Sequence, residues 1–294
     1  MKDYCSTVNY IETDHLIVNR DCQDLLRDAG LQSFESVWRF SGGEVVKQIK
    51  ERSVIRFDFS HHGMKRTFYL KRHHLKFIGL GRLLSRFFPE LCVSQGRLEF
   101  DNICDFRKNK LPTVAPVAAG ERSVRLFWSE SFLITEDPSP LISLENMLRD
   151  YPQYLQGPKH SSRRKILLHE MALLARKMHE RGFNHLDFNT THILLHYENH
   201  TDVPTLALFD LQRVDKRKFC RFRWKIKSLA RLNYSLPDGL FNEKDRVYLF
   251  LCYQGKENFN FVDSLQWSWI KKKTDRIRRH TQKIMAKKTC GYGR

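Results

Sequence analysis

The sequence lacks the paired cysteines that build a disulfide framework or a zinc ribbon. Its seven cysteines lie far apart, and no CxxC pair occurs among them. Closely spaced cysteines in even number mark secreted disulfide scaffolds and structural zinc sites, so neither class fits this chain. We expect reduced thiols, as in a cytoplasmic protein.

Long apolar runs are also missing. No stretch approaches the ~18 apolar residues that a membrane-spanning helix needs. The N-terminal segment MKDYCSTVNYIETDH is polar and acidic, and it contains no apolar signal core. These absences predict a soluble cytoplasmic protein, which is still compatible with peripheral binding to the inner face of the cytoplasmic membrane.

Acidic residues are scarce relative to basic ones. The chain carries 51 Lys and Arg against 33 Asp and Glu, which gives a net charge of +18 and a pI near 9.7. Such a balance favours acidic partners, which include nucleic acid, anionic membranes and phosphorylated or carboxylated substrates. No helix-turn-helix, zinc or RNA-binding signature accompanies the charge, so we expect no nucleic-acid partner.

The order of apolar patterns predicts a strand-rich first part and a largely helical second part. Four of the nine prolines fall between residues 137 and 160, which suggests a hinge there. Runs rich in branched and aromatic residues predict strands at 34–40, 45–59, 66–71, 123–128, 131–136 and 205–211. Helical periodicity predicts helices at about 94–109, 161–181, 243–253 and 263–288. Ser161 or Ser162 is the expected cap of the second helix, and Asn242 is the expected cap of the third.

Two aspartates in the second part suggest phosphoryl transfer. Asp187 follows His185 in an HxD sequence after a capped helix, and Asp210 ends a later strand. A carboxylate in a loop can accept the proton of an attacking hydroxyl, and a second one at a strand end can hold Mg²⁺ against nucleotide phosphates. Each motif is common by itself, so their order along the chain carries the interpretation.

A lysine and a glutamate in the first part supply the matching half of such a site. Lys71 lies inside an apolar strand, and Glu99 lies on the apolar stripe of a predicted helix. Charges directed toward a core are costly unless they are paired. Pairing these two satisfies both and leaves the ammonium for the α- and β-phosphates of a nucleotide. The alternative is a lysine at a strand end and a glutamate on a solvated helix face.

With these motifs in order, the sequence resembles the lipopolysaccharide core heptose kinase family, part of the protein-kinase-like superfamily that includes the Kdo kinases. The resemblance covers about residues 35–255. It is carried by TFYLK with Lys71, GRLEF with Glu99, FLITEDPSPLISLE, ARKMHERG, NHLDFNTTHILLH and FDLQR.

The resemblance implies an α+β, protein-kinase-like fold with two lobes. The N-terminal lobe, 1–136, would be small and β-rich with one helix, would bind the nucleotide, and would begin with an extension at 1–33. The C-terminal lobe, 137–294, would be larger and mainly helical, with the catalytic loop, the metal site and a basic C-terminal helix.

The resemblance also implies a role for each matching residue. Asp187 would be the catalytic base, Asp210 and His192 the magnesium ligands, and Lys71 with Glu99 the pair that orients ATP. His192 stands at the fifth position after Asp187, where Kdo kinases tend to have Asn, and it therefore favours the heptose kinase branch.

The cofactor-binding residues continue into two further segments. Residues around Glu136 and Asp137 would contact adenine through the backbone, and Gly42 and Gly43 would cover the phosphates. The SGGE sequence there departs from the usual GxGxxG. In RWKIKSL (223–229), Ser228 stands where the family usually has an Asp that braces the catalytic loop.

The last predicted helix combines an apolar seam with dense positive charge. Ile270, Ile277 and Ile284 recur every seven residues among lysines and arginines. This pattern is typical of a solvated helix that packs its seam on the rest of the fold. It also suits an anionic membrane surface, where a lipid-linked core sugar would be presented.

The favoured interpretation is an ATP- and Mg²⁺-dependent kinase that phosphorylates a heptose of the lipopolysaccharide inner core. A kinase for another acceptor (Kdo, a small molecule or a protein) is one alternative. A catalytically silent ATP-binding regulator, which Ser228 favours, is another. The sequence does not define an oligomeric state.

Overall fold

A computed structural model of the chain divides it into two compact units, residues 1–139 with 210–212, and residues 140–209 with 213–294. The described residues are 3–13, 15–76, 94–125, 128–157, 160–198, 203–216, 219 and 221–291.

The first unit is built on one seven-stranded antiparallel sheet with the strand order β1-β2-β6-β7-β5-β4-β3. Its strands are β1 (Tyr10–Glu12), β2 (Leu16–Asn19), β3 (Glu44–Ile49), β4 (Arg52–His61), β5 (Met64–Lys76), β6 (Pro116–Arg125) and β7 (Trp128–Glu136). Its helices are η1 (Arg20–Cys22), α1 (Gln23–Asp28), α2 (Phe34–Arg39) and α4 (Gln95–Lys108).

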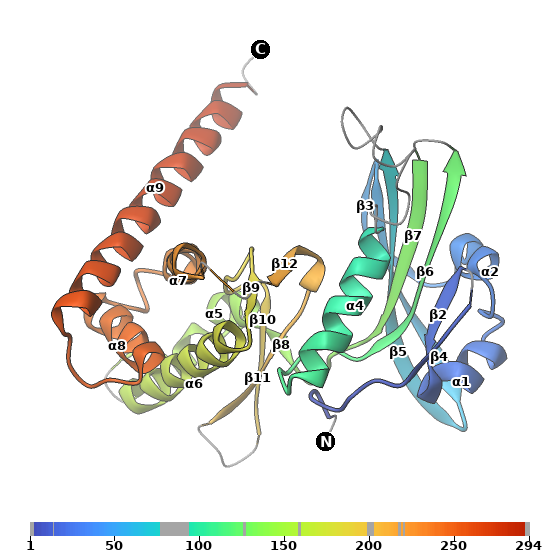
Figure 1. The fold of residues 1–294 in the computed structure, drawn as a ribbon, viewed down its shortest axis with the longest axis horizontal. Coiled ribbons are helices and arrows are strands. Elements are labelled where there is room, and N and C mark those ends of the chain that lie inside the picture. Colours follow the sequence, from blue (N-terminus) through green and yellow to red (C-terminus); the bar gives the residue numbers. More distant parts are fainter. Residues whose placement is uncertain are drawn as a thin grey trace. The chain divides into compact units, whose positions relative to one another are not determined.

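Alternation along β5 sends neighbouring side chains to opposite faces of this sheet. Phe68 and Leu70 are fully buried in a core that includes residues of α1 and α2. Lys71, the next residue, faces α4, which packs on β6 and β7 (Figure 1). The sheet therefore has an apolar face under α1 and α2. On its other face, under α4, Lys71 of β5 pairs with Glu99 of α4.

The predicted strand at 34–40 is wrong, because this segment forms α2. Ser33 caps the helix: its Oγ accepts a hydrogen bond from the Ser36 N–H, and the Ser36 hydroxyl reciprocates. Phe34 and Val37, three positions apart, are buried on one helical face. The aromatic and branched residues that suggested a strand are thus the core-facing side of a short helix. The expectation of one helix in the N-terminal lobe is corrected as well, since α1, α2 and α4 all belong to the first unit.

The predicted extension at 1–33 contributes two strands to the sheet and a helix to the core of this unit. β1 and β2 form an edge hairpin that pairs with β6. Arg107 at the end of α4 holds the preceding segment, because its guanidinium donates to the carbonyls of Asp3 and Ser6 at 2.7 Å each. These long-range contacts hold residues 1–33 in place, and they leave no local pattern in the sequence. For this reason no helix or strand was predicted there.

The second unit is mainly helical and also contains short strands. Its helices are α5 (Leu144–Asp150), η3 (Pro152–Tyr154), α6 (Ser161–Glu180), α7 (Phe222–Ser235), α8 (Glu243–Gln254) and α9 (Phe261–Gly291), and η5 (Leu211–Arg213) ends in it. β8 (Ile142–Ser143), β10 (Ile193–Tyr197) and β11 (Pro204–Leu208) form one sheet, and β9 (Phe183–His185) pairs with β12 (Val214–Lys216).

Helices α6, α8 and α9 lie close to their predicted ranges, whereas α5 and α7 were not predicted. Asn242 caps α8 with a capping box, and Gly182 follows α6 with a φ of 84°. One expected cap is wrong: α6 begins after His160, without a side-chain cap, rather than at Ser161 or Ser162.

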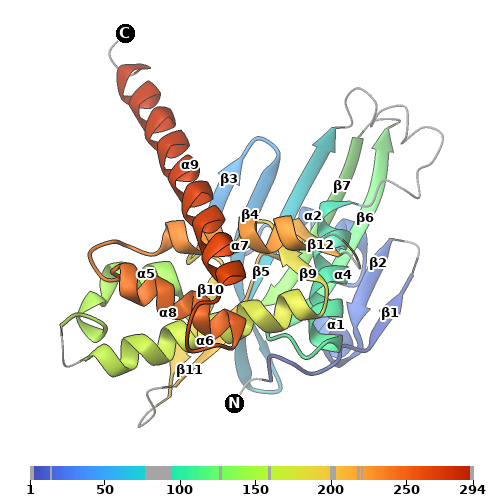
Figure 2. The same cartoon turned by 60° about the vertical axis from the view of Figure 1, so that its left-hand side comes forward.

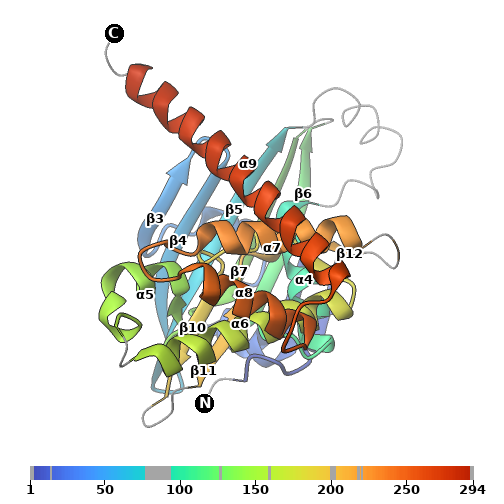
Figure 3. The ribbon, with the colours of Figure 1, turned by 90° about the vertical axis from the view of Figure 1, so that its left-hand side faces the viewer.

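The apolar seam of α9 is buried only at its first position. Ile270 is 1% exposed, whereas Ile284 is 42% exposed. Helix α9 lies across α7 (Figure 3), and its C-terminal part extends beyond the other helices of this unit (Figure 2). Among the described residues, no helix combines the length and apolar composition that a bilayer crossing requires.

A buried histidine between α6 and α8 makes the stability of this unit sensitive to acid. His179 is 2% exposed and lies 3.0 Å from the Tyr253 hydroxyl through its Nδ1. Burial, with a smaller contribution from Lys225, lowers the pKa of His179 to about 3. Between that pKa and the unfolded value near 6.5, the unfolded chain binds the additional proton, so stability falls as pH falls.

We expect His179 to cost the protein ~2 kcal/mol of unfolding free energy between pH 7 and pH 5. Urea denaturation of wild type and His179→Gln at both pH values measures this, and the variant should lose less stability by that amount. His73, whose pKa burial lowers to about 4, acts in both proteins and cancels in the difference. Equal pH dependence in the two proteins would contradict the assignment.

Candidate active site

Lys71 and Glu99 form a buried ion pair in the first unit. The Lys71 Nζ lies 2.7 Å from Oε1 of Glu99, whose side chain is fully buried. Ser94 fixes the start of α4 by accepting a hydrogen bond from the Arg97 N–H, which sets Glu99 at its place on the helix. Burial by itself would lower the pKa of Lys71, but the carboxylates of Glu99 and Asp210 outweigh burial and raise it. The ammonium therefore stays charged.

Asp210 joins this pair from far along the chain. Its Oδ1 lies 3.5 Å from the Lys71 Nζ, and its backbone is left-handed, with a φ of 57°. Such a conformation is uncommon for a residue other than glycine and is frequent at functional sites. The following turn is tied to α4, because the Asn102 amide donates to the Leu211 carbonyl at 2.8 Å. The carboxylate is thus held beside the ammonium by both backbone and helix.

Arg52 is a member of this cluster that the sequence did not predict. Its guanidinium lies 3.9 Å from Oδ2 of Asp210, and its Nε is buried without a hydrogen-bond partner among the described residues. Arg52 begins β4 directly opposite His73 on β5. The register of β4 against β5 brings Arg52 to the site. In a sequence rich in basic residues, nothing marks this one arginine as a site residue.

The positions of Gly42 and Gly43 do not fit the expected phosphate-covering role. They precede β3, and a Cβ at Gly43 would meet the Arg56 carbonyl at 2.4 Å. The β3–β4 turn, which leads into Arg52, is instead formed by Lys50 and Glu51. Gly43, with a φ of 110°, therefore serves a close backbone approach at the start of β3.

The segment after β7 has its backbone amides already engaged. The Glu136 N–H donates to the Ala115 carbonyl at 3.0 Å, and the Asp137 N–H donates to the Thr67 carbonyl at 2.8 Å. The Glu136 carboxylate pairs with Arg66, and Asp137 Oδ1 accepts from the Ser139 N–H at 2.7 Å. These bonds fix the segment at the end of the sheet, and any contact from these amide donors to an adenine would have to replace one of them.

The loop that carries Asp187 lies in the second unit and is held from several sides. His185 is fully buried, and its Nδ1 accepts a hydrogen bond from the Asp187 N–H at 3.1 Å. That bond assigns the ring proton to Nε2, which lies 3.4 Å from the Phe209 carbonyl. The Leu186 N–H donates to the Arg213 carbonyl at 2.8 Å. The histidine of the HxD sequence thus positions the aspartate through its backbone.

Asp187 itself pairs with Arg213 and faces a groove. The Arg213 Nη1 lies 2.8 Å from Oδ2 and 3.2 Å from Oδ1 of Asp187, whose side chain is 30% exposed. The groove, of about 820 Å³, lies among this loop, α7 and α9. A carboxylate has more acceptor sites than one guanidinium nitrogen uses, so it can still accept a proton from a hydroxyl in the groove.

His192 follows Asp187 by five residues at the end of the same loop. Its ring centroid is 5.4 Å from that of His185 and 5.5 Å from that of Phe209. Its backbone N–H donates to the Asn189 carbonyl at 3.1 Å. The ring is therefore oriented by aromatic neighbours within the second unit.

Helix α7 braces the Asp187 loop through Ser235, and Ser228 takes no part in this. Ser228 is 1% exposed, and its hydroxyl has no hydrogen-bond partner among the described residues. Two turns later, Ser235 Oγ accepts a hydrogen bond from the Thr190 N–H at 3.0 Å, and its carbonyl accepts from the Thr190 hydroxyl at 3.4 Å. The loop is thus connected to α7 despite the departure at 228.

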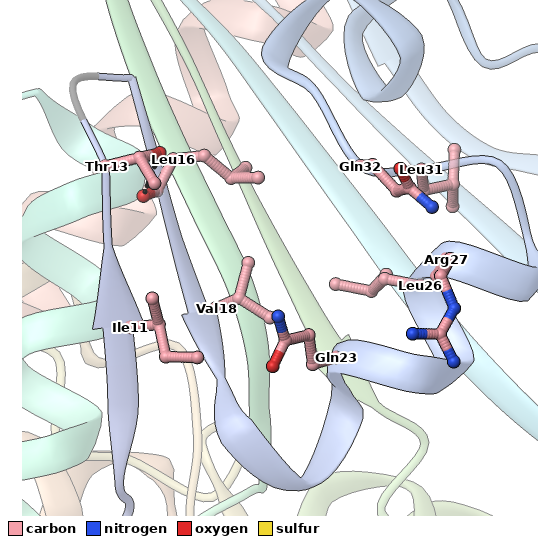
Figure 4. Close-up of a pocket in the computed structure, with 9 residues that line it drawn as sticks. All are labelled: Ile11, Thr13, Leu16, Val18, Gln23, Leu26, Arg27, Leu31 and Gln32. Carbon is pink, nitrogen blue, oxygen red and sulfur yellow. Dashed lines mark hydrogen bonds between the residues drawn. The ribbon is translucent and has the colours of Figure 1, made fainter.

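Another pocket, in the first unit, contains none of the predicted site residues. It has a volume of about 290 Å³ and lies between the β1–β2 hairpin and α1, with Ile11, Leu16 and Leu26 on its walls (Figure 4). Its lining is mostly apolar and offers no carboxylate for phosphoryl transfer, so it is not a candidate for this chemistry.

Comparisons with known proteins identify relatives of this chain. The chain is 28% identical over 262 residues to "Lipopolysaccharide core heptose(I) kinase WaaP" of Escherichia coli (strain K12), covering 86% of this chain and 94% of that protein. A protein of the same name from Escherichia coli is 31% identical over 221 residues, covering 74% and 79%. The one from Pseudomonas aeruginosa is 28% identical over 231 residues, covering 76% and 81%.

A solved structure has the same fold. "WaaP in complex with acyl carrier protein" superposes with a TM-score of 0.66 at 24% identity, covering 89% of this chain and 98% of that one. The predicted α+β kinase-like fold is thereby confirmed. The sequence model of the lipopolysaccharide kinase (Kdo/WaaP) family matches residues 35–253, which is most of the chain. The chain belongs to the lipopolysaccharide kinase (Kdo/WaaP) family, as its motifs predicted.

Proposed function

We propose that this protein transfers the γ-phosphoryl group of ATP to a heptose hydroxyl in the lipopolysaccharide inner core. The observation that carries the proposal is Asp187, held in a braced HxD loop on the wall of a groove wide enough for a sugar. The names of the curated relatives support heptose as the acceptor. The acceptor is presented as part of a lipid-linked core saccharide.

The first unit supplies the residues for ATP. Lys71, oriented by Glu99, would bind the α- and β-phosphates, and Arg52 would add a second cation from the start of β4. Carbonyl groups in the segment around Glu136 and Asp137 would accept from the adenine amino group. Both cations now contact Asp210, so phosphate oxygens would compete for them with its carboxylate.

Asp210 fits the requirements of a magnesium ligand. Mg²⁺ in kinases is bound by one or two carboxylates, by waters and by the phosphates themselves, so a protein cage of three acidic side chains is unnecessary. Within the described residues, no group of three or more His, Cys, Asp or Glu gathers. When bound, Mg²⁺ would neutralise charge on the β- and γ-phosphates. Because Mg²⁺ prefers oxygen donors, His192 is a weaker candidate and rests on the family resemblance.

The second unit supplies the residues for the acceptor. Asp187 would accept the proton as the hydroxyl oxygen attacks the γ-phosphorus and ADP leaves. Arg213, within 2.8 Å of Asp187, would hold the carboxylate ionised and directed toward the groove. The chemistry of this unit is thus orientation of one hydroxyl and removal of one proton.

Phosphotransfer from labelled ATP to defined core saccharides tests the proposal. Wild type should label lipopolysaccharide that ends at the inner-core heptose, and it should not label lipopolysaccharide truncated to the Kdo residues. Mass spectrometry of the product should place the phosphate on heptose. Labelling of the Kdo-only acceptor would favour the Kdo alternative. ATP binding without transfer to any acceptor would favour a silent regulator, the alternative that Ser228 favours because it stands where the family usually has an Asp.

We also propose that the distal part of α9 contacts an anionic membrane surface. Lys283 and Lys287 are exposed there beside Ile284 and Met285, which are 42% and 59% exposed. Basic residues near an anionic bilayer each contribute ~1 kcal/mol. Wild type should sediment with vesicles containing anionic lipid at low salt, and Lys283→Glu/Lys287→Glu should not. Equal sedimentation of both proteins would refute this contact.

A further inference from the structure

The groove beside Asp187 contains an arginine that is not paired with a carboxylate of the described residues. Arg231 on α7 lines the groove, and among the described residues it has no carboxylate within 4.0 Å. Arg278, which lines the groove from α9, differs in this respect, because Asp238 lies 3.3 Å from it. Arg213 is likewise occupied by Asp187. Arg231 is therefore the cation of the groove that is available to an anion from outside.

Two lysines reinforce the positive charge at this position. Lys227 precedes Arg231 by one helical turn on α7, and Lys273 precedes the groove-lining Ile277 by one turn on α9. Burial lowers the pKa of Lys273, and the neighbouring cations Arg276, Lys227 and Arg231 lower it further. Like charges held together in this way repel one another, so a bound anion would be attracted by all of them.

Arg231 and Asp187 line the same groove, and α7 connects them. Ser235 on α7 bonds Thr190 of the loop that bears Asp187, and Arg231 lies one helical turn, about 6 Å, before Ser235. Tyr234, Thr281 and Gln282 line the groove beside these residues and offer hydroxyl and amide groups for sugar hydroxyls. A sugar at Asp187 and an acidic substituent or neighbour at Arg231 would therefore occupy the groove together.

We propose that Arg231, supported by Lys227 and Lys273, binds an anionic group of the acceptor, a carboxylate or a phosphate on a sugar next to the one that is phosphorylated. This inference rests on the proposed function, since it assigns the groove to the acceptor of that reaction. Arg231 is a specificity-determining residue: it selects acidic saccharides over neutral ones and takes no part in the transfer itself.

The test compares Arg231→Met with wild type, using detergent-solubilised core saccharide as the acceptor. Loss of a charge-assisted hydrogen bond should weaken acceptor binding about tenfold or more, measured both as KM and as the equilibrium Kd without ATP. The KM for ATP should stay within about twofold. Arg231→Lys should recover part of the affinity. Arg279→Met, on an exposed part of α9 outside the groove, removes the same charge and should leave acceptor binding unchanged.

Modified acceptors identify the anion. If a carboxylate is bound, wild type and Arg231→Met should bind a carboxyl-reduced saccharide equally; if a phosphate is bound, a phosphatase-treated saccharide should abolish the difference. An acceptor KM and Kd within about twofold of wild type in Arg231→Met, with transfer intact, would overturn the inference. So would failure of wild type to bind the acceptor. Binding by wild type that depends on Arg231 but leads to no transfer would overturn the proposed function alone.

Discussion

Asp187→Asn is expected to lower kcat by about 10²–10⁴-fold, the usual contribution of general base catalysis. Asparagine has the same shape, and its carbonyl oxygen can still accept from Arg213, which contacts Asp187 at 2.8 Å. The amide cannot take up the proton of the attacking hydroxyl. The loss should therefore appear in kcat, with the KM for the acceptor little changed.

The binding of ATP provides the control for this variant. Lys71, Glu99 and Asp210 belong to the first unit, so Asp187→Asn in the second unit should bind ATP as wild type does. Asp150→Asn is the matched substitution, because Asp150 is exposed on the second unit and pairs only with its neighbour Arg149 among the described residues. It should keep full activity. Activity of Asp187→Asn within tenfold of wild type would mean that another group takes the proton.

The candidate catalytic and nucleotide-binding residues were predictable from the sequence because their motifs are local. His185 and Asp187 lie two positions apart, and Lys71 stands out as a charge within an apolar strand. The pairing of Lys71 with Glu99 follows from the cost of burying either alone, and the two lie 2.7 Å apart in the structure. Roles in catalysis and metal binding remain proposals for all of them.

The groove and its charge were not predictable in the same way. Its walls come from the Asp187 loop, α7 and α9, which are separated by tens of residues, and no local pattern records how these helices pack. Arg231 is one basic residue among 51, and it becomes informative only because the described part of the structure places no carboxylate beside it. The same holds for Arg52, because only the register of β4 against β5 shows that it lies at the site.

Errors of secondary structure had a comparable origin. Residues 34–40 combine aromatic and branched side chains, which fit a strand by composition. The capping serine at 33 and the spacing of Phe34 and Val37 favour a helix, and burial of that face against the sheet decides between the two. Tertiary contacts thus outweighed propensity over a segment too short to show helical periodicity.

Lys71→Met is expected to reduce both stability and activity, but for separable reasons. It leaves the Glu99 carboxylate fully buried and without its partner at 2.7 Å, which should cost ~3–5 kcal/mol of unfolding free energy. It also removes a cation from the phosphates, which should lower kcat roughly 10²–10³-fold. Lys65→Met is the matched control on the same strand, since Lys65 is 70% exposed and its surface pair with Asp58 should contribute little to stability.

The double variant Lys71→Met/Glu99→Leu separates the two effects. Removing both charges eliminates the unpaired buried carboxylate, so stability should return to within about 2 kcal/mol of wild type. Activity should remain as low as in Lys71→Met, because the phosphates still lack their cation. Denaturant unfolding and kcat measured on the same preparations provide both readouts. If the double variant were as unstable as the two single variants combined, Lys71 and Glu99 would not be energetically coupled. Each residue would then stabilise the fold through other contacts, and the penalty expected for an unpaired buried carboxylate would be wrong.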